Sequence, residues 1–290
     1  MAKKKTKRKT TKRDPETAER NKRIAIGTSI VVLTGAVFVG GAMGVGELDR
    51  AAAATIVNGT PEIKIDWPTL SDGTIWMPLR EQENLHKSIA RAIQGGKALS
   101  AEPLREAVLT LQGSGWVDGV PEARWTSDGT IELDASWRIP AAVVRTGQRE
   151  ILIDWNRVVL PLDYAIGESN QRFFTNVDAP LPRVGEQWLG TDLHDGIALL
   201  RELRKNGLLE QVDGFDLGSG AHSGSITIIT TRGTEIYWGA GPGRERPGEQ
   251  VSSVKVQYLR EIYKRAGLLD GGMEYIDIRG DDIMVKKHSD

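Results

Sequence analysis

Apolar residues form one long uninterrupted run near the start of the chain and shorter periodic patterns after it. The long run covers residues 24–46, which are 23 residues without a charged side chain. A helix of this length extends about 34 Å, enough to cross a hydrocarbon core of roughly 30 Å. Its six glycines are tolerable in lipid, where a helix satisfies its own backbone groups. The run therefore predicts one transmembrane helix.

The region after residue 60 shows two different spacings of apolar residues. Leu, Ile and Val four positions apart predict helices over residues 80–93, 102–111, 191–206 and 251–266. Alternation of period two and short apolar runs predict strands over residues 61–67, 120–125, 130–137, 142–145, 150–154, 157–160, 211–217, 225–231, 235–238, 273–279 and 283–287. The Asp128-Gly129 step predicts a hairpin, because glycine takes the positive φ angle that such turns need.

The order of these elements predicts an α+β fold in two parts. Residues 61–141 have the order strand, helix, helix, strand, strand. Residues 142–285 are expected to form a mixed, mainly antiparallel β domain with helices on one face. Residues 47–60 are expected to be a linker, and residues 286–290 a short tail.

Charge is distributed unevenly along the chain. Residues 1–23 hold eleven basic and three acidic residues, a net charge of +8, and the remainder of the chain has a net charge of −9. Basic residues before an apolar span predict a cytoplasmic N-terminus and an extracytoplasmic C-terminal domain in the cytoplasmic (inner) membrane. The basic tail is also expected to contact anionic lipid. Nothing beyond charge indicates nucleic acid, so no nucleic-acid partner is expected.

A cleaved signal peptide is the alternative interpretation of the apolar run. The small residues 51–54 could suit a signal peptidase. However, the run is longer than the usual apolar core of a signal peptide, about 7–15 residues, and its basic leader is long. We therefore expect a retained anchor.

The sequence offers little that predicts catalysis. The four histidines, His86, His194, His222 and His288, are too far apart in sequence for a zinc-binding motif. The acids of residues 192–195 occur where a helix N-terminus favours them, so capping is the preferred interpretation. Ser223 lacks the G-x-S-x-G spacing, and residues 239–248 lack a phosphate-binding motif. We expect no enzyme activity, metal, cofactor or small-molecule substrate.

Two further compositional features concern the exported part. The chain has no cysteine, so this part must be stabilised without disulfides. Its eight tryptophans are expected in the core and at interfaces, with a carbohydrate-binding surface as the alternative.

Several short motifs occur in an order that resembles a known family. They are residues 115–117 (GWV), 123–126 (ARWT), 136–142 (SWRIPAA), 151–154 (ILID), 181–182 (LP), 226–239 and 275–279 (YIDIR). With the preceding apolar span, they resemble the FtsQ/DivIB bacterial cell-division proteins, which carry a POTRA domain and a C-terminal β domain. The sequence departs from the family pattern at Thr126, Trp137 and Gly280, and in residues 70–79 and 173–179.

The resemblance implies a bitopic scaffold at the division site and no cofactor. Its partners would be other single-pass division proteins, FtsL-like and FtsB/DivIC-like. Capture would occur by β-strand addition at a sheet edge formed by residues 275–285. The implied contact residues are Tyr275, Ile276, Asp277, Ile278, Arg279, Ile283 and Val285. We expect the isoleucines of residues 275–279 to face the core, and Tyr275, Asp277 and Arg279 to face the partner or solvent.

The alternative function is an envelope-anchored POTRA-containing or wall-binding module that has a different partner. Both functions share the predicted anchor and the predicted extracytoplasmic domain. They differ in the partner that the domain binds.

Overall fold

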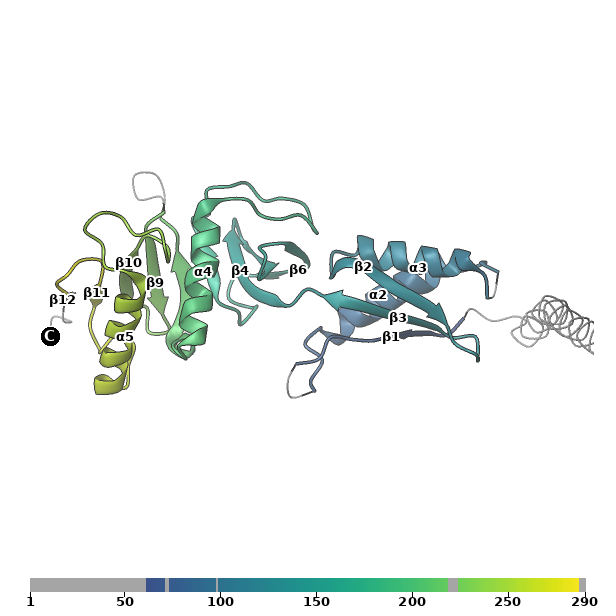
Figure 1. Ribbon diagram of the computed structural model, residues 1–290, viewed down its shortest axis with the longest axis horizontal. Coiled ribbons are helices and arrows are strands. Elements are labelled where there is room, and N and C mark those ends of the chain that lie inside the picture. The colour runs from purple at the N-terminus through teal and green to yellow at the C-terminus, as the bar shows by residue number, and fades with distance from the viewer. Residues whose placement is uncertain (1–60, 71–72, 98, 219–223, 287–290) are drawn as a thin grey trace, which may run out of the picture. The chain divides into compact units, whose positions relative to one another are not determined.

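The structure is a computed structural model that describes residues 61–70, 73–97, 99–218 and 224–286. The predicted basic tail, transmembrane helix and linker lie outside the described residues. No helix within the described ranges is long and apolar enough to cross a membrane. The described residues form a mixed α+β fold with two sheets (Figure 1).

The first sheet has the predicted order of strand, helix, helix, strand, strand. Its elements are β1 (Ile63–Ile65), α2 (Leu79–Ala92), α3 (Ala101–Gly113), β2 (Val117–Trp125) and β3 (Ile131–Trp137). Strand β3 is central, parallel to β1 and antiparallel to β2. The turn between β2 and β3 contains a glycine with a φ angle of 82°, as the predicted hairpin requires.

The second sheet has nine strands in the order β12-β11-β10-β9-β8-β7-β4-β5-β6. The strands are β4 (Pro140–Thr146), β5 (Arg149–Asp154), β6 (Val159–Ala165), β7 (Phe173–Thr175), β8 (Val212–Asp216), β9 (Ile226–Thr230), β10 (Glu235–Gly239), β11 (Tyr275–Asp277) and β12 (Met284–Lys286). Three of its pairings are parallel: β10 with β11, β4 with β7, and β7 with β8. The other five are antiparallel, so the sheet is mixed and mainly antiparallel.

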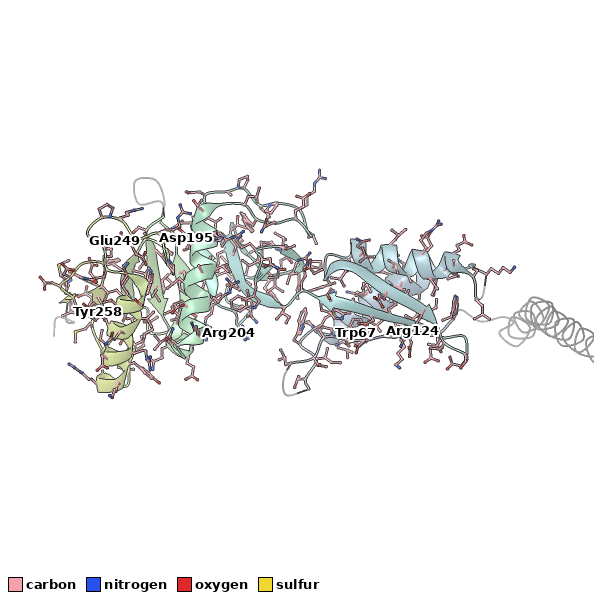
Figure 2. All side chains as sticks on the ribbon, in the orientation of Figure 1. Trp67, Arg124, Asp195, Arg204, Glu249 and Tyr258 are labelled. Carbon is pink, nitrogen blue, oxygen red and sulfur yellow. The ribbon has the colours of Figure 1, made fainter. Side chains whose placement is uncertain are left out.

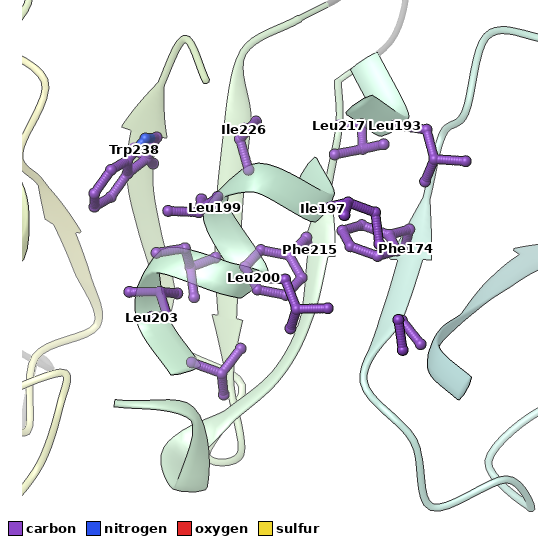
Figure 3. Close-up of a cluster of buried hydrophobic side chains, with 14 of the residues drawn as sticks. Phe174, Leu193, Ile197, Leu199, Leu200, Leu203, Phe215, Leu217, Ile226 and Trp238 are labelled. Atoms are coloured by element: carbon purple, nitrogen blue, oxygen red, sulfur yellow. The ribbon is translucent and has the colours of Figure 1, made fainter. Parts of the chain in front are cut away.

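Helices α4 (Thr191–Lys205) and α5 (Ser252–Ala266) pack on the same face of this sheet. Leucines and isoleucines of α4 contact side chains from the central strands, among them Phe174, Phe215 and Trp238 (Figure 3). Val256 and Leu259 of α5 belong to the same cluster. The 3-10 helix η1 (Leu209–Gln211) connects α4 to β8.

A second cluster of buried residues lies under α2 and α3. It contains Leu85, Ile89 and Ile93, which are four positions apart as predicted. It also contains Val143 and Phe173 from the second sheet.

Two local sequence predictions were wrong. Strand β7 was not predicted, although it lies inside the sheet between β4 and β8. It is only three residues long, too short for a periodic pattern. Strand β6 begins at Val159 rather than at Arg157, because Arg157 belongs to a turn and has a φ angle of 66°.

The predicted sheet edge needs a larger correction. Strand β11 is paired on both sides, parallel to β10 and antiparallel to β12. The chain turns after Ile278 and returns as β12, which covers β11 and becomes the outermost strand. Tyr275–Asp277 is therefore an inner strand, and the edge is Met284–Lys286.

Candidate partner-binding edge

The nine-stranded sheet ends in two edge strands, β6 and β12, which differ in how their outer sides are protected. In β6 the outer side is partly paired: Gly185 N donates to Val159 O (2.8 Å), and Val159 N donates to Glu186 O (3.0 Å). The strand also contains Pro161, which has no N–H group to offer a foreign strand. Both features are usual means of blocking an edge.

Strand β12 has neither protection. Ile283, Met284 and Val285, which are consecutive in sequence, are 38%, 58% and 49% exposed. Within the described residues β12 pairs with β11 alone, with Val285 opposite Ile276 and Met284 opposite Asp277. Successive residues of a strand alternate in hydrogen-bond direction, so part of its backbone N–H and C=O groups point away from β11.

The predicted contact residues of β11 are divided between the core and a local ion pair. Ile276 and Ile278 are buried under α5, as expected. Asp277 is also buried, contrary to the expectation that it faces a partner or solvent. Its carboxylate accepts bonds from the backbone N (3.0 Å), Nε (2.9 Å) and Nη2 (2.6 Å) of Arg279. These hydrogen bonds lower the pKa of Asp277, although burial opposes the shift.

The face of β10 and β11 opposite the helices is aromatic and charged. The rings of Tyr237 and Tyr275 lie 5.6 Å apart, and the Arg279 guanidinium lies 5.7 Å from the Tyr237 ring. The Tyr237 hydroxyl donates to Glu235 (2.8 Å), which raises the pKa of Tyr237. Met284 and Lys286 are the β12 neighbours of this face, since they pair with Asp277 and Tyr275.

Sequence reasoning did not name Met284 and Lys286 as contact residues. It predicted two strands, residues 273–279 and 283–287, but treated residues 275–285 together as the sheet edge, which ends before Lys286. The signal was present in the sequence: three apolar residues follow Gly280-Asp281-Asp282, a sequence typical of a turn. Of the predicted contact residues, Val285 lies in this edge strand and Ile283 directly precedes it.

The candidate catalytic residues are not assembled into a site in the described part of the chain. His86 Nε2 lies 3.3 Å from the Ile63 carbonyl oxygen, and His194 Nδ1 contacts the Arg157 guanidinium. His222, Ser223 and His288 lie outside the described residues. No group of three or more His, Asp or Glu side chains within the described ranges has a metal-binding arrangement.

The interpretation of residues 192–195 as acids at a helix N-terminus is confirmed for Asp192, which lies in the first turn of α4. The Asp192 carboxylate accepts a hydrogen bond from Asp178 N (2.8 Å), so it ties the preceding loop to α4. The N-cap residue is Gly190, and no side-chain hydrogen bond caps the helix there. Asp195 is buried beside Arg244 (3.6 Å); burial raises the pKa of its carboxyl, and Arg244 opposes this rise.

All eight tryptophans are buried or half-buried. Trp116, Trp188 and Trp238 belong to the two cores. Trp67 and Trp137 stack with their ring centroids 5.5 Å apart. These positions confirm the predicted core role for Trp116, Trp188 and Trp238, and the interface role stays a prediction.

Comparison with known proteins does not assign the chain to a family. No protein-family model matches it, and no curated protein is similar to it. The resemblance to FtsQ/DivIB proteins is therefore a prediction from the motifs.

Proposed function

We propose that this protein is a bitopic scaffold of the bacterial cell-division machinery. Its domain outside the cytoplasmic membrane captures another single-pass division protein, of the FtsL or FtsB/DivIC kind, as an added β-strand. The observation that carries the proposal is the edge strand β12, whose outer side has no strand partner within the described residues; Met284 and Val285 in it and Ile283 just before it are exposed. The order of elements in the first sheet and the sequence motifs support the proposed family.

The contrast between the two edges of the sheet supports strand addition at β12. A long or apolar edge invites pairing with foreign strands, and natural proteins usually block it. Here Pro161 and the pairing at Val159 obstruct β6, while neither kind of obstruction is found at β12 in the part of the chain that the structure describes. In strand addition, backbone hydrogen bonds give affinity and alternate side chains give selectivity.

The contact residues are revised accordingly. Ile283, Met284, Val285 and Lys286 would contact the added strand directly. The β11 residues would hold β12 in place without contacting the added strand. Ile276 and Ile278 lie in the core, and Asp277 is bonded to Arg279.

A matched pair of substitutions tests the proposal in the full-length protein in its native membrane. Val285→Asp places a carboxylate on the edge, where an apolar contact is expected to hold the partner. Leu181→Asp makes the same change at a residue of almost equal exposure, 48%, in the loop before α4. We expect small bitopic proteins to co-purify with the wild type and with Leu181→Asp, and to be lost with Val285→Asp.

Two outcomes would contradict the proposal. Retention of the partner by Val285→Asp would exclude the β12 edge. Co-purification of wall glycan or outer-membrane machinery instead of small bitopic proteins would favour the alternative envelope module. A binding role also predicts that His194→Ala and Ser223→Ala variants retain cellular function, whereas loss of function in a folded variant would favour an enzyme.

A further inference from the structure

A row of basic side chains lies along the exposed side of α4. It consists of Arg201, Arg204 and Lys205 from the helix and Arg157 from the turn before β6; we call these four residues the α4 cation row. Arg157 contacts the Nδ1 atom of His194, which is on the same helix face two turns before Arg201. At 1.5 Å per residue, the distance from His194 to Lys205 along the helix is about 16 Å.

Trp155 orders the middle of the row. The guanidinium carbons of Arg204 and Arg201 lie 5.0 Å and 5.6 Å from its ring centroid. Arg201 Nη2 also donates to the Trp155 carbonyl oxygen (3.3 Å). Figure 2 labels Arg204, which lies near the C-terminal end of α4. Contacts of this kind hold the cations in place before a ligand arrives, which lowers the entropic cost of binding.

The α4 cation row carries positive charges that no carboxylate of the described residues pairs with. Within the described residues, none of the four makes an ion pair with a carboxylate, in contrast to Arg138, Arg145 and Arg279. The nearest acid in sequence, Glu202, accepts a hydrogen bond from the Asn206 side chain (3.0 Å). The row is thus a locally cationic surface in a region whose net charge is −9.

Arg157 occupies a backbone conformation that does not suit arginine. Its φ angle is 66°, in the left-handed region that favours glycine or asparagine. The turn is held by Asp154, whose carboxylate accepts from Asn156 N and Val158 N (both 2.8 Å). The Nε atom of Arg157 is buried without a hydrogen-bond partner in the described structure. Backbone strain of this kind is concentrated at functional sites.

From this geometry we propose that the α4 cation row binds a linear phosphodiester polymer that carries no aromatic bases. Guanidinium groups match phosphate oxygens in a two-point geometry, and a line of four cations fits successive phosphates of one chain. Sites for single-stranded nucleic acid usually add an aromatic platform on which the bases stack, whereas the Trp155 ring is already contacted by two guanidinium groups. The inference is independent of the scaffold function proposed above.

The test uses the full-length protein in neutral detergent micelles and poly(glycerol phosphate) as the probe. Arg201→Gln with Arg204→Gln removes two charges and keeps the aliphatic stems beside Trp155. Arg260→Gln with Lys264→Gln makes an equal charge change on α5 and is the matched control. The basic tail is present in every variant, so its contribution to binding is constant.

We expect the α4 double variant to weaken binding about tenfold. Each phosphate contact contributes about 0.7 to the slope of log K against log salt, so the loss of two contacts should lower this slope by about 1.4. The α5 pair should leave both quantities near the wild-type values. Hydrogen exchange of α4 should slow on binding in the wild type. Equal effects of the two pairs, or no change in α4 exchange, would overturn the proposal. Tighter binding of polyglutamate, single-stranded DNA or anionic vesicles through the same residues would also overturn it.

The Arg157→Gly variant distinguishes an effect on polymer binding from an effect on folding stability. Glycine relieves the positive φ angle, so the urea midpoint should remain equal or increase. The salt slope should nevertheless fall by about 0.7, since one phosphate contact is lost. An unchanged slope would show that Arg157 makes no phosphate contact and only shapes the turn. The α4 cation row, which was defined to include Arg157, would then be wrong.

Discussion

The Nζ atom of Lys255 donates a hydrogen bond of 2.6 Å to the backbone carbonyl oxygen of Trp238, and both side chains are completely buried. The same ammonium lies 5.2 Å from the Trp238 ring centroid and 3.5 Å from a carboxylate oxygen of Glu249. Burial lowers the pKa of Lys255, and Glu249 opposes this shift. The contact joins α5 to β10, and it is a buried charge that is satisfied by several partners.

Replacing Lys255 by methionine should destabilise the fold strongly. The apolar side chain fills a similar volume but leaves the Trp238 carbonyl without the Lys255 donor and Glu249 without its ion-pair partner. Breaking a buried pair from one side costs about 3 kcal/mol. Urea unfolding followed by tryptophan fluorescence measures the loss. Lys264→Met, at an exposed position of the same helix, is the control and should change stability by no more than about 0.5 kcal/mol.

A second prediction concerns the close approach of β7 and β8. A methyl group on Gly214 would lie 2.5 Å from ring atoms of Phe173, its partner across the two strands. The ring cannot move aside easily, because Phe173 is buried and the Arg145 guanidinium lies 3.3 Å from its centroid. Gly214→Ala should therefore lower the free energy of unfolding by about 2 kcal/mol.

The same glycine-to-alanine substitution at Gly113 should not lower the free energy of unfolding. Gly113 is the last residue of α3, and a methyl group there would meet no atom within 4 Å. Alanine favours a helix over glycine, so Gly113→Ala should be neutral or stabilising by up to about 1 kcal/mol. Similar destabilisation by both substitutions would mean that the approach of Gly214 to Phe173 is not the cause.

The elements that could be predicted from the sequence are those with a local pattern. Leu85, Ile89 and Ile93 repeat every four residues, and that spacing was sufficient to predict α2. The turn before β3 followed from Asp128-Gly129, since glycine accepts the φ angle of 82° that is observed. In these cases the information lies within a few residues of the element.

Pairing between strands could not be predicted in this way. Phe173 and Phe174 belong to a strand of three residues, and its partners β4 and β8 are distant in sequence. The sequence predicted that Ile276 faces the core, because alternation determines the face of a strand. It did not predict that β12 covers β11, because the edge depends on where the chain returns after the turn. The Tyr237–Tyr275 contact was missed for the same reason.

The proposed membrane anchor gives a further prediction, which depends on the uncharged run of residues 24–46 and the net charge of +8 before it. Protease added to spheroplasts should remove the large C-terminal domain and leave the basic tail protected. Cell lysis before digestion should expose the tail and is the control. A mature N-terminus near Ala54 would show that the run is a cleaved signal peptide.

The start of α5 is capped by a carboxylate seven residues earlier in the chain. One oxygen of Glu245 accepts hydrogen bonds from Ser252 N (2.8 Å), Ser252 Oγ (2.6 Å) and Gly243 N (3.2 Å). The first N–H groups of a helix have no partner within the helix, and the helix dipole favours a negative charge there. Burial opposes ionisation of this group, but the hydrogen bonds from Ser252 and Gly243 outweigh it and lower the pKa of Glu245 to about 2.

This shift predicts an acid-sensitive contribution to stability. Because the folded-state pKa lies below the ordinary value of 4.5, the contribution is fully present above pH 4.5 and is lost as the pH falls toward about 2. Its size is of order 1–3 kcal/mol. Urea unfolding from pH 7 to pH 2 should show wild-type stability falling more steeply below pH 4.5 than that of Glu245→Gln, and the two curves should converge at low pH. Because the amide is uncharged, Glu245→Gln should already be less stable at pH 7. Parallel curves over the whole range would mean that the Glu245 cap contributes no net stability through its charge.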